Sequence, residues 1–171
     1  LLSRMLSLTF LGTGAACPSA DRNVRGLALA REGETLLFDC GEGTQRQMMR
    51  YGVSFAFREI FFSHYHADHT GGNEKLRAAG GTITGGNVAG DIGDAAVGAA
   101  IIATENTLNH MSAPTGQTAA TPTGAWPTST FFDEEKKLWF NNDAIQIIHP
   151  EKAHTDGDVI VFFRKADVIV K

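Results

Sequence analysis

The sequence predicts one α/β or α+β domain over residues 1–171, with mostly antiparallel sheets. Its 171 residues are enough to bury a sizeable hydrophobic core in one domain. Hydrophobic residues make up 43% of the chain and charged residues 20%, which is ordinary for a globular protein. Short apolar segments typical of strands are mixed with helix-like segments, and no internal repeat is present.

The N-terminal part carries clear strand and helix signals. Short apolar strands are expected at 7–11, 26–30, 34–39 and 59–63, and helices at 44–51 and about 72–79. Glu32-Gly33 is expected to form the hairpin turn between the second and third strands. Thr44 is expected to cap the first helix, and Gly52 to end it.

Residues 80–130 have a different composition, rich in Gly, Ala and Thr. They are predicted to be a loop-rich insertion that contains only a short strand at 101–104 and a short helix at 105–111. Strand signals then return at 138–140, 144–148, 158–163 and 167–170.

Charge and hydropathy exclude some classes of function. A net charge of -4 gives no overall electrostatic footprint for nucleic acid. No apolar run approaches the ~18 residues that span a bilayer, so no membrane partner is expected. Cys17 and Cys40 are far apart and form no CxxC motif. Reduced thiols and a cytoplasmic location are therefore expected, although the sequence alone leaves a disulfide open.

The most informative stretch is HYHADH at 64–69, which contains His64, His66, Asp68 and His69. Side chains two residues apart on a strand point the same way, so the first two histidines are expected to converge where the strand ends. Asp68 and His69 lie where the chain turns, so they would approach the same metal site from another side. Imidazole and carboxylate ligands suit zinc. The alternative is a His-rich solvated turn, which this density of ligand residues disfavours.

A second histidine turn, AHTDGD at 153–158, lies between two predicted strands. His154 would complete a three-histidine site with His64 and His66, and three protein ligands plus water are typical of catalytic zinc. Water on such a zinc ion loses a proton near neutral pH and becomes a nucleophile. The alternative for His154 is a hydrogen-bonding turn residue. His149 and His110 are expected to be structural or surface residues.

These motifs resemble the metallo-β-lactamase superfamily, in HYHADH followed by Thr70-Gly71-Gly72 and in AHTDGD. The resemblance implies an αββα sandwich with the metal site at one edge. Residues 5–69 resemble the RNase Z branch, a tRNA 3′-processing endonuclease, in TFLGTGAACPS, DRNVRGLAL and LLFDCGEGTQRQMMRYGVSFAFREIFF. Residues 70–170 resemble another hydrolase branch, in phrases such as ENTLNHMSAPTG and HTDGDVIVFFRKADVIV. A chimera with a junction near 70–72 is therefore expected.

The resemblance also implies roles for individual residues. Asp68 would orient or deprotonate the attacking water. Asp39 would accept the N–H of a ligand imidazole, which fixes that ring's tautomer. Ser19, Arg22 and Asn23 would contact RNA near the cleavage site. The alternatives are a strand-end turn residue for Asp39 and an ordinary polar turn for the other three.

The resemblance implies Asp68 and His69 as ligands of a second metal, but this second site of the superfamily is expected to be incomplete in this chain. There, a strand like DVIV is normally followed by Thr-Gly-Asp, whose Asp bridges two metals, and by a later histidine. One zinc ion is therefore expected, and a second would need water, Asp156, Asp158 or a partner chain. RNA is a candidate substrate, but efficient tRNA processing is not expected because the RNase Z docking arm, which follows the third motif, has no room.

Three functional hypotheses remain open. The leading one is a zinc-binding hydrolase scaffold with weak phosphodiesterase or nuclease activity that uses metal-activated water. The second is a recombined, truncated fragment with a structural metal and no enzyme activity. Its exposed sheet edge would favour a homodimer or a domain swap. The third is hydrolysis of a β-lactam or a thioester.

Overall fold

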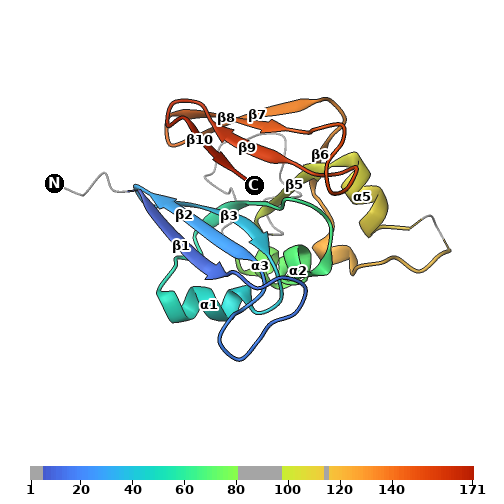
Figure 1. Ribbon diagram of the computed structural model, residues 1–171, viewed down its shortest axis with the longest axis horizontal. Coiled ribbons are helices and arrows are strands. Elements are labelled where there is room, and N and C mark those ends of the chain that lie inside the picture. Colours follow the sequence, from blue (N-terminus) through green and yellow to red (C-terminus); the bar gives the residue numbers. More distant parts are fainter. Residues whose placement is uncertain (1–5, 81–97, 114–115) are drawn as a thin grey trace.

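The computed structural model describes residues 6–80, 98–113 and 116–171. Two sheets lie face to face, and the larger has the strand order β1-β2-β3-β4-β5-β6 (Figure 1). Its strands are β1 (Ser7–Gly12), β2 (Gly26–Arg31), β3 (Glu34–Cys40), β4 (Phe57–Phe61), β5 (Ala100–Thr104) and β6 (Ser129–Phe131). The smaller sheet has the order β10-β9-β8-β7 and consists of β7 (Glu135–Phe140), β8 (Asp143–Ile148), β9 (Ile160–Phe163) and β10 (Val168–Val170).

Helices line the outer face of the larger sheet (Figure 1). They are α1 (Thr44–Tyr51), α2 (Ala67–Thr70) and α3 (Asn73–Ala79), while α5 (Glu105–Met111) packs at the β5–β6 end, and the 3-10 helix η1 (Thr123–Ala125) contacts α3. The described residues thus supply one helical layer and both sheets of the expected αββα sandwich, which confirms the fold class.

Strand pairing is mixed. Within the described residues, β1–β2, β2–β3 and all pairs of the smaller sheet are antiparallel, whereas β3–β4, β4–β5 and β5–β6 are parallel. Most pairs of described strands are therefore antiparallel, as expected, but the half of the larger sheet from β3 to β6 is parallel. The stretch 80–130 contributes β5 and the start of β6 to that sheet, and its residues 81–97 and 114–115 lie outside the described part.

The central strands are buried on both faces, which explains their continuous apolar runs. Leu37 and Ile60 face the helices and share a core with Met48. Leu36 and Phe61 face the other sheet in a second core, which also contains the side chains of Phe38, Ile102, Ile145, Ile147, Val161 and Phe163. Burying one such side chain contributes about 1.5–3 kcal/mol. These two cores hold β4, β8 and β9, the strands next to the loops that carry the histidines.

The local turn signals are mostly confirmed. Glu32 and Gly33 have φ of 51° and 86°, as a tight hairpin with two left-handed residues requires. Gly52 ends α1 with φ of 66°. The prediction of Thr44 as an N-cap is wrong, because Gly43 occupies that position with φ of 82° and no side chain caps the helix. The Thr44 hydroxyl instead donates to the Gly41 carbonyl at 2.8 Å.

Two long-range backbone hydrogen bonds hold the two ends of the stretch 63–72, which contains His64 and His66. The Gly72 N–H donates to the Cys40 carbonyl at 2.7 Å, which ties the start of α3 to the end of β3. The Val159 N–H donates to the Ser63 carbonyl at 3.0 Å and links the residues after β4 to those before β9. The loop after β4 is therefore held between the two sheets.

Two other expectations concern the whole chain. Cys17 is exposed and Cys40 is buried, and both are free thiols, as expected. Among the described residues, no helix has the length and apolar character needed to cross a bilayer.

Candidate metal centre

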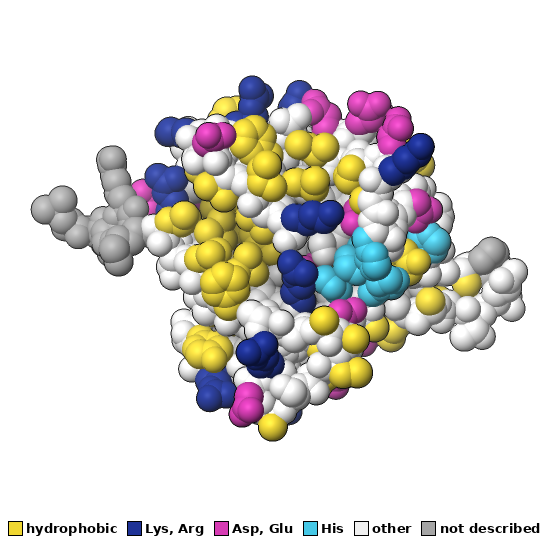
Figure 2. All heavy atoms as spheres, viewed as in Figure 1, with side chains coloured by type: hydrophobic (Ala, Val, Ile, Leu, Met, Phe, Trp, Pro, Cys, Tyr) yellow, Lys and Arg dark blue, Asp and Glu magenta, His cyan; other side chains and the backbone are white. Residues whose placement is uncertain are grey.

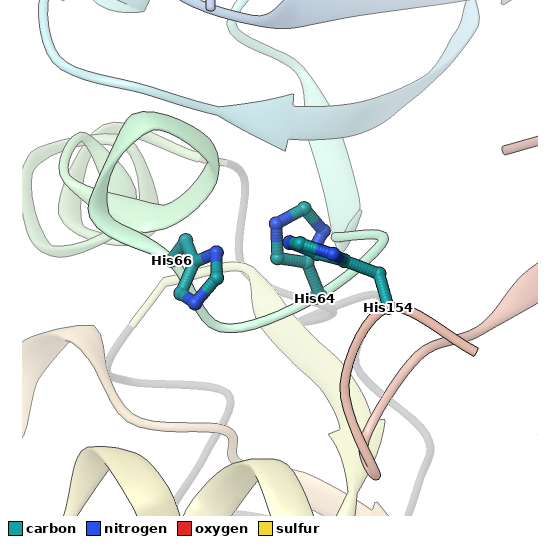
Figure 3. Close-up of side chains that lie close together, drawn as sticks. All are labelled: His64, His66 and His154. Carbon is teal, nitrogen blue, oxygen red and sulfur yellow. The ribbon is translucent and has the colours of Figure 1, made fainter. Parts of the chain in front are cut away.

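Three histidines from two separate loops converge at one end of the sandwich. His64 and His66 lie between β4 and α2, and His154 lies between β8 and β9. One ring nitrogen of each can be chosen so that all three lie within 4.8 Å of one another. The rings point toward a common space (Figure 3). Three imidazoles at such spacing form a donor set that fits a divalent metal such as zinc.

The local route to this convergence differs from the prediction. β4 ends at Phe61, so His64 and His66 lie in a loop rather than on a strand. His66 is extended, with φ of -61° and ψ of 149°, and immediately precedes α2. The turn into α2, rather than strand alternation, therefore brings the two rings together.

The surroundings of the His64 imidazole favour its neutral form. It is 9% exposed, and its ring centroid lies 4.0 Å from that of His69. Burial, followed by the nearby His69 and His66 rings, lowers the pKa of His64 to about 4. A neutral imidazole has a lone pair for a metal, so this ring is available as a ligand at neutral pH.

Ser63 and Asp39 hold the neighbouring rings. The Asp39 carboxylate is buried and accepts the Ser63 N–H at 2.7 Å. Asp39 Oδ2 lies 3.0 Å from His69 Nδ1. The Ser63 hydroxyl lies 3.1 Å from His64 Nδ1 and 3.0 Å from His69 Nδ1. Because an ionised carboxylate only accepts hydrogen bonds, His69 donates from Nδ1, which is the contact predicted for Asp39.

Asp68 and His69 form a pair beside the three-histidine group. His69 Nε2 lies 3.4 Å from Asp68 Oδ2. Asp68 Oδ2 also accepts the Ala16 N–H at 2.9 Å. Partial burial opposes the charge on Asp68, but this backbone donor and the nearby His69 outweigh it and lower the pKa of the carboxyl. Asp68 is therefore ionised at neutral pH.

The turn that carries His154 is organised by Asp158. This carboxylate is 1% exposed and accepts the Thr155 N–H at 2.7 Å, the Thr155 hydroxyl at 2.6 Å and the His154 N–H at 3.3 Å. Burial opposes its charge, but the Thr155 hydrogen bonds and nearby His64 prevail, and the pKa of Asp158 is lowered. The carboxylate thus fixes the backbone on which His154 is mounted.

Replacing Asp158 with Asn is expected to change the acid sensitivity of the metal-free protein. A carboxyl whose folded pKa is depressed adds stability above its unfolded pKa of about 3.9, and this contribution is lost as the pH falls through the folded value. The stability difference between the wild type and Asp158→Asn should therefore shrink from pH 7 to pH 3. Urea unfolding in the presence of a chelator, at pH 7 and at pH 3, measures this stability difference. An equal difference at the two pH values would contradict the role of the Asp158 carboxylate in fixing the turn.

The predicted RNA-contact residues lie in the loop between β1 and β2. Ser19 and Arg22 are exposed and close a turn, in which the Ser19 N–H donates to the Arg22 carbonyl at 2.8 Å. Asn23 is half-buried, and its Nδ2 has no hydrogen-bond partner among the described residues. The Asn23 carbonyl accepts the Gly14 N–H at 2.8 Å. None of the three belongs to the histidine group, although Ala16 of the same loop contacts Asp68.

Two contacts at the site had no signal in the sequence. Ser63 was not predicted as a bridge between Asp39 and the rings, and its only hint was its position directly before His64. The Ala16 backbone donor carries no side-chain information.

Asp156 and Asp158 were considered as substitute ligands for a second metal, and both have other partners. Asp156 lies 2.8 Å from His110, and Asp158 accepts the hydrogen bonds of the Thr155 turn.

A cavity of about 380 Å³ lies between the two sheets, and its lining includes Ser63, Asp68 and His69, the neighbours of the three-histidine group. Its polar end is formed by Asp39, Ser63, Asp68 and His69, with Arg25 on the same wall. Its apolar walls include Phe10, Leu27, Phe38, Phe61, Val161 and Val170. In the face shown in Figure 2, the histidines form one group, with Lys and Arg side chains beside it. The site is therefore accessible from this face.

Comparison with known proteins supports the resemblance seen in the sequence. Residues 6–82, less than half of the chain, match the family model described as "Anti-Pycsar protein Apyc1". Ribonuclease Z of Gemmatimonas aurantiaca is 66% identical over 64 residues, which is 37% of this chain and 20% of that protein. Ribonuclease Z of Myxococcus xanthus is 58% identical over 65 residues, 38% of this chain and 21% of that protein. The match spans about a fifth of the length of these relatives.

Solved structures share the fold over most of the described chain. The metallo-beta-lactamase fold protein YhfI from Bacillus subtilis has a TM-score of 0.64 at 15% identity, over 96% of this chain and 60% of that one. A metallo-beta-lactamase from Cronobacter sakazakii gives 0.62 at 19%, over 92% and 57%. The short form of human tRNase Z gives 0.60 at 24%, over 95% and 66%. At these identities the likeness concerns the fold alone.

The comparisons confirm the predicted metallo-β-lactamase fold and the likeness of the N-terminal segment to ribonuclease Z. The likeness of residues 70–170 to another hydrolase branch and the junction near residues 70–72 stay predictions. The high identity to ribonuclease Z is confined to the N-terminal segment. The structural likeness extends over both sheets. The chain has the metallo-β-lactamase fold, and its N-terminal segment is homologous to ribonuclease Z.

Proposed function

We propose that this chain is a metal-dependent hydrolase scaffold that holds one zinc ion through His64, His66 and His154. The observation that carries the proposal is the convergence of these three rings from two loops, with ligand atoms within 4.8 Å of one another. The donor set fits zinc because imidazole is among its preferred ligands and a site with three protein ligands leaves a position for water or substrate.

A bound zinc ion supplies Lewis acidity, which lowers the pKa of water and polarises a phosphoryl or carbonyl oxygen. Asp68 would accept a hydrogen bond from the attacking water and orient it. The lowered pKa of Asp68 makes it a weak base, so orientation is its main role. Asp39 and Ser63 would hold His69 and His64 in fixed rotamers and tautomers.

The substrate class that we propose is a phosphodiester. Homology to ribonuclease Z over the N-terminal segment supports this choice, as does the cationic Arg25 beside the cavity. RNA is the natural candidate, with Ser19 and Arg22 exposed on the loop that also contacts Asp68 through Ala16. Asn23 would act mainly through the shape of that loop, since its side chain is half-buried.

The test is hydrolysis of bis(p-nitrophenyl) phosphate by the metal-free protein and after addition of one equivalent of zinc. Turnover that requires zinc and is lost on chelation would support the proposal. Hydrolysis of nitrocefin or of a glutathione thioester instead would assign a β-lactam or thioester substrate. Stoichiometric zinc without turnover on any of the three would leave a structural metal and contradict the hydrolase proposal.

Replacing Asp68 with Asn is expected to lower kcat by about 100-fold, in the range typical of a positioned acid or base, with zinc stoichiometry unchanged. The side chain keeps its size and can still accept the Ala16 N–H, so the fold should be retained. Steady-state kinetics and metal analysis on the same sample measure both effects. Loss of the zinc ion in this variant would mean that Asp68 is a ligand of that ion.

We also propose that the chain self-associates through the open edges of its sheets. Among the described residues β1 and β10 are edge strands, and their exposed apolar side chains include Leu8, Phe10 and Ile169. Figure 2 shows hydrophobic side chains gathered on the face that also carries the histidines. An edge strand with apolar side chains is a template for pairing with another strand.

Light scattering over a range of concentrations is expected to show a dimer that Leu8→Lys dissociates, because a lysine on an edge strand opposes pairing. Met49→Lys is the matched control, since Met49 is an exposed apolar residue on a helix, α1, and not on an edge strand. A monomer at every concentration would contradict the proposal.

A further inference from the structure

Helix α5 contacts both loops that supply the metal-binding histidines. It lies at the β5–β6 end of the larger sheet, next to the turn that carries His154 (Figure 1). Its residues Asn106, Thr107 and His110 all bond to Asp156 or Gly157. Those two residues follow His154 by only two and three positions.

The first set of contacts fixes the backbone of the turn. Asn106 Nδ2 donates to the Asp156 carbonyl at 2.8 Å. The hydroxyls of Thr107 and Thr104 donate to the Gly157 carbonyl at 3.2 and 3.3 Å. The contact is close, since a Cβ on Gly157 would lie 2.3 Å from Thr107 Oγ1. Helix α5 and the turn are therefore packed without a gap.

The second set of contacts links the turn to the other loop. His110 Nε2 lies 2.8 Å from Asp156 Oδ1, and as this carboxylate only accepts, the imidazole donates. The same ring stacks on Tyr65, with centroids 4.3 Å apart and an interplanar angle of 13°. Tyr65 lies between His64 and His66 in sequence, and its ring packs against that of His66 with centroids 5.0 Å apart.

We infer that Asn106 and His110, two exposed side chains of α5, are positioning residues for the metal centre. Through their contacts, α5 sets the position of His154 relative to His66. The inference rests on the proposed metal centre. His110 and Asp156 are 41% and 60% exposed, and an exposed pair of this kind contributes little to global stability. Its effect should therefore be local, on the spacing of the two ligands.

The test uses cobalt(II) as the probe, because its visible absorption reports ligand geometry. The double variant Asn106→Ala/His110→Phe removes both polar contacts and keeps a ring that can stack on Tyr65. It should bind cobalt about 10-fold or more weakly, in the range seen when residues behind the ligands are removed, and show altered visible bands. Its thermal midpoint should stay close to that of the wild type. His110→Gln, which can still donate to Asp156, should recover part of the affinity.

Asn109→Ala is the matched control, because Asn109 is an exposed residue of the same type on the same helix. Cobalt affinity and bands equal to the wild type in the folded double variant would overturn the inference. Amide exchange at Thr155 in the metal-free protein gives a second readout and should be faster in the double variant but not in Asn109→Ala. If the wild type binds no cobalt, the proposed metal centre is wrong. In that case the exchange rate of the Thr155 amide decides the positioning role of α5, and a rate unchanged in the double variant would overturn it.

Discussion

Replacing His64 with alanine is expected to abolish stoichiometric zinc binding. Removing a group behind a ligand typically costs 10- to 100-fold in metal affinity, so removing one of three ligands should cost more than about 100-fold. After dialysis against micromolar zinc, the wild type should retain one ion per chain and His64→Ala none. His66→Ala should behave in the same way, and because His66 is exposed, its loss disturbs packing less.

His149 offers a control of the same residue type. It lies outside the three-histidine group, and its Nδ1 is 2.9 Å from the Asp158 carbonyl. His149→Gln should therefore keep the ion. Zinc at about 1,000 times its Kd should also stabilise the wild type by about 4 kcal/mol and leave His64→Ala unchanged. Wild-type affinity in His64→Ala would show that the ligand set is wrong.

The convergence of the three histidines could be predicted from sequence because metal sites need a particular residue chemistry at close spacing. HYHADH places two imidazoles two residues apart, and His154 lies in a turn between two strands. The prediction that strand alternation brings the His64 and His66 rings together was wrong, however. The strand ends at Phe61, and the backbone before α2 orients the two rings. Several local conformations can bring the same ligands together, so the residue types were more informative than the strand period.

The supporting contacts could not be predicted in this way. The bond from Ala16 to Asp68 spans 52 residues and uses a backbone N–H, which every residue except proline has. Asn106 and His110 lie 50 and 46 residues from Asp156, and nothing in their local pattern marks them. The three-residue strand β6 lacks the length for a period signal. Pairing partners and tertiary contacts depend on topology rather than on local propensity.

Replacing Gly41 with alanine is expected to reduce stability by about 3 kcal/mol, the upper part of the range for overpacking a buried site. A Cβ on Gly41 would lie 2.2 Å from the Asp68 carbonyl oxygen and 2.4 Å from Val24 Cγ2. The first of these is a backbone atom, which no side-chain rotation can move away. The chain after β3 must therefore separate from α2, which carries Asp68 and His69.

Gly33→Ala separates this clash from the general cost of replacing a glycine. Gly33 has φ of 86° with no atom within 4 Å of an added Cβ, so only the left-handed backbone is penalised, at about 1–2 kcal/mol. Urea unfolding should therefore rank Gly41→Ala as clearly less stable than Gly33→Ala. Zinc affinity should fall only in Gly41→Ala, because His66 directly precedes α2 and moves with it, while the hairpin at Gly33 lies in another turn. Equal stability and equal zinc affinity in the two variants would mean that the chain after β3 and α2 are not in the contact described. The loop that carries His64 and His66 would then be held by the Ser63 and Gly72 hydrogen bonds alone.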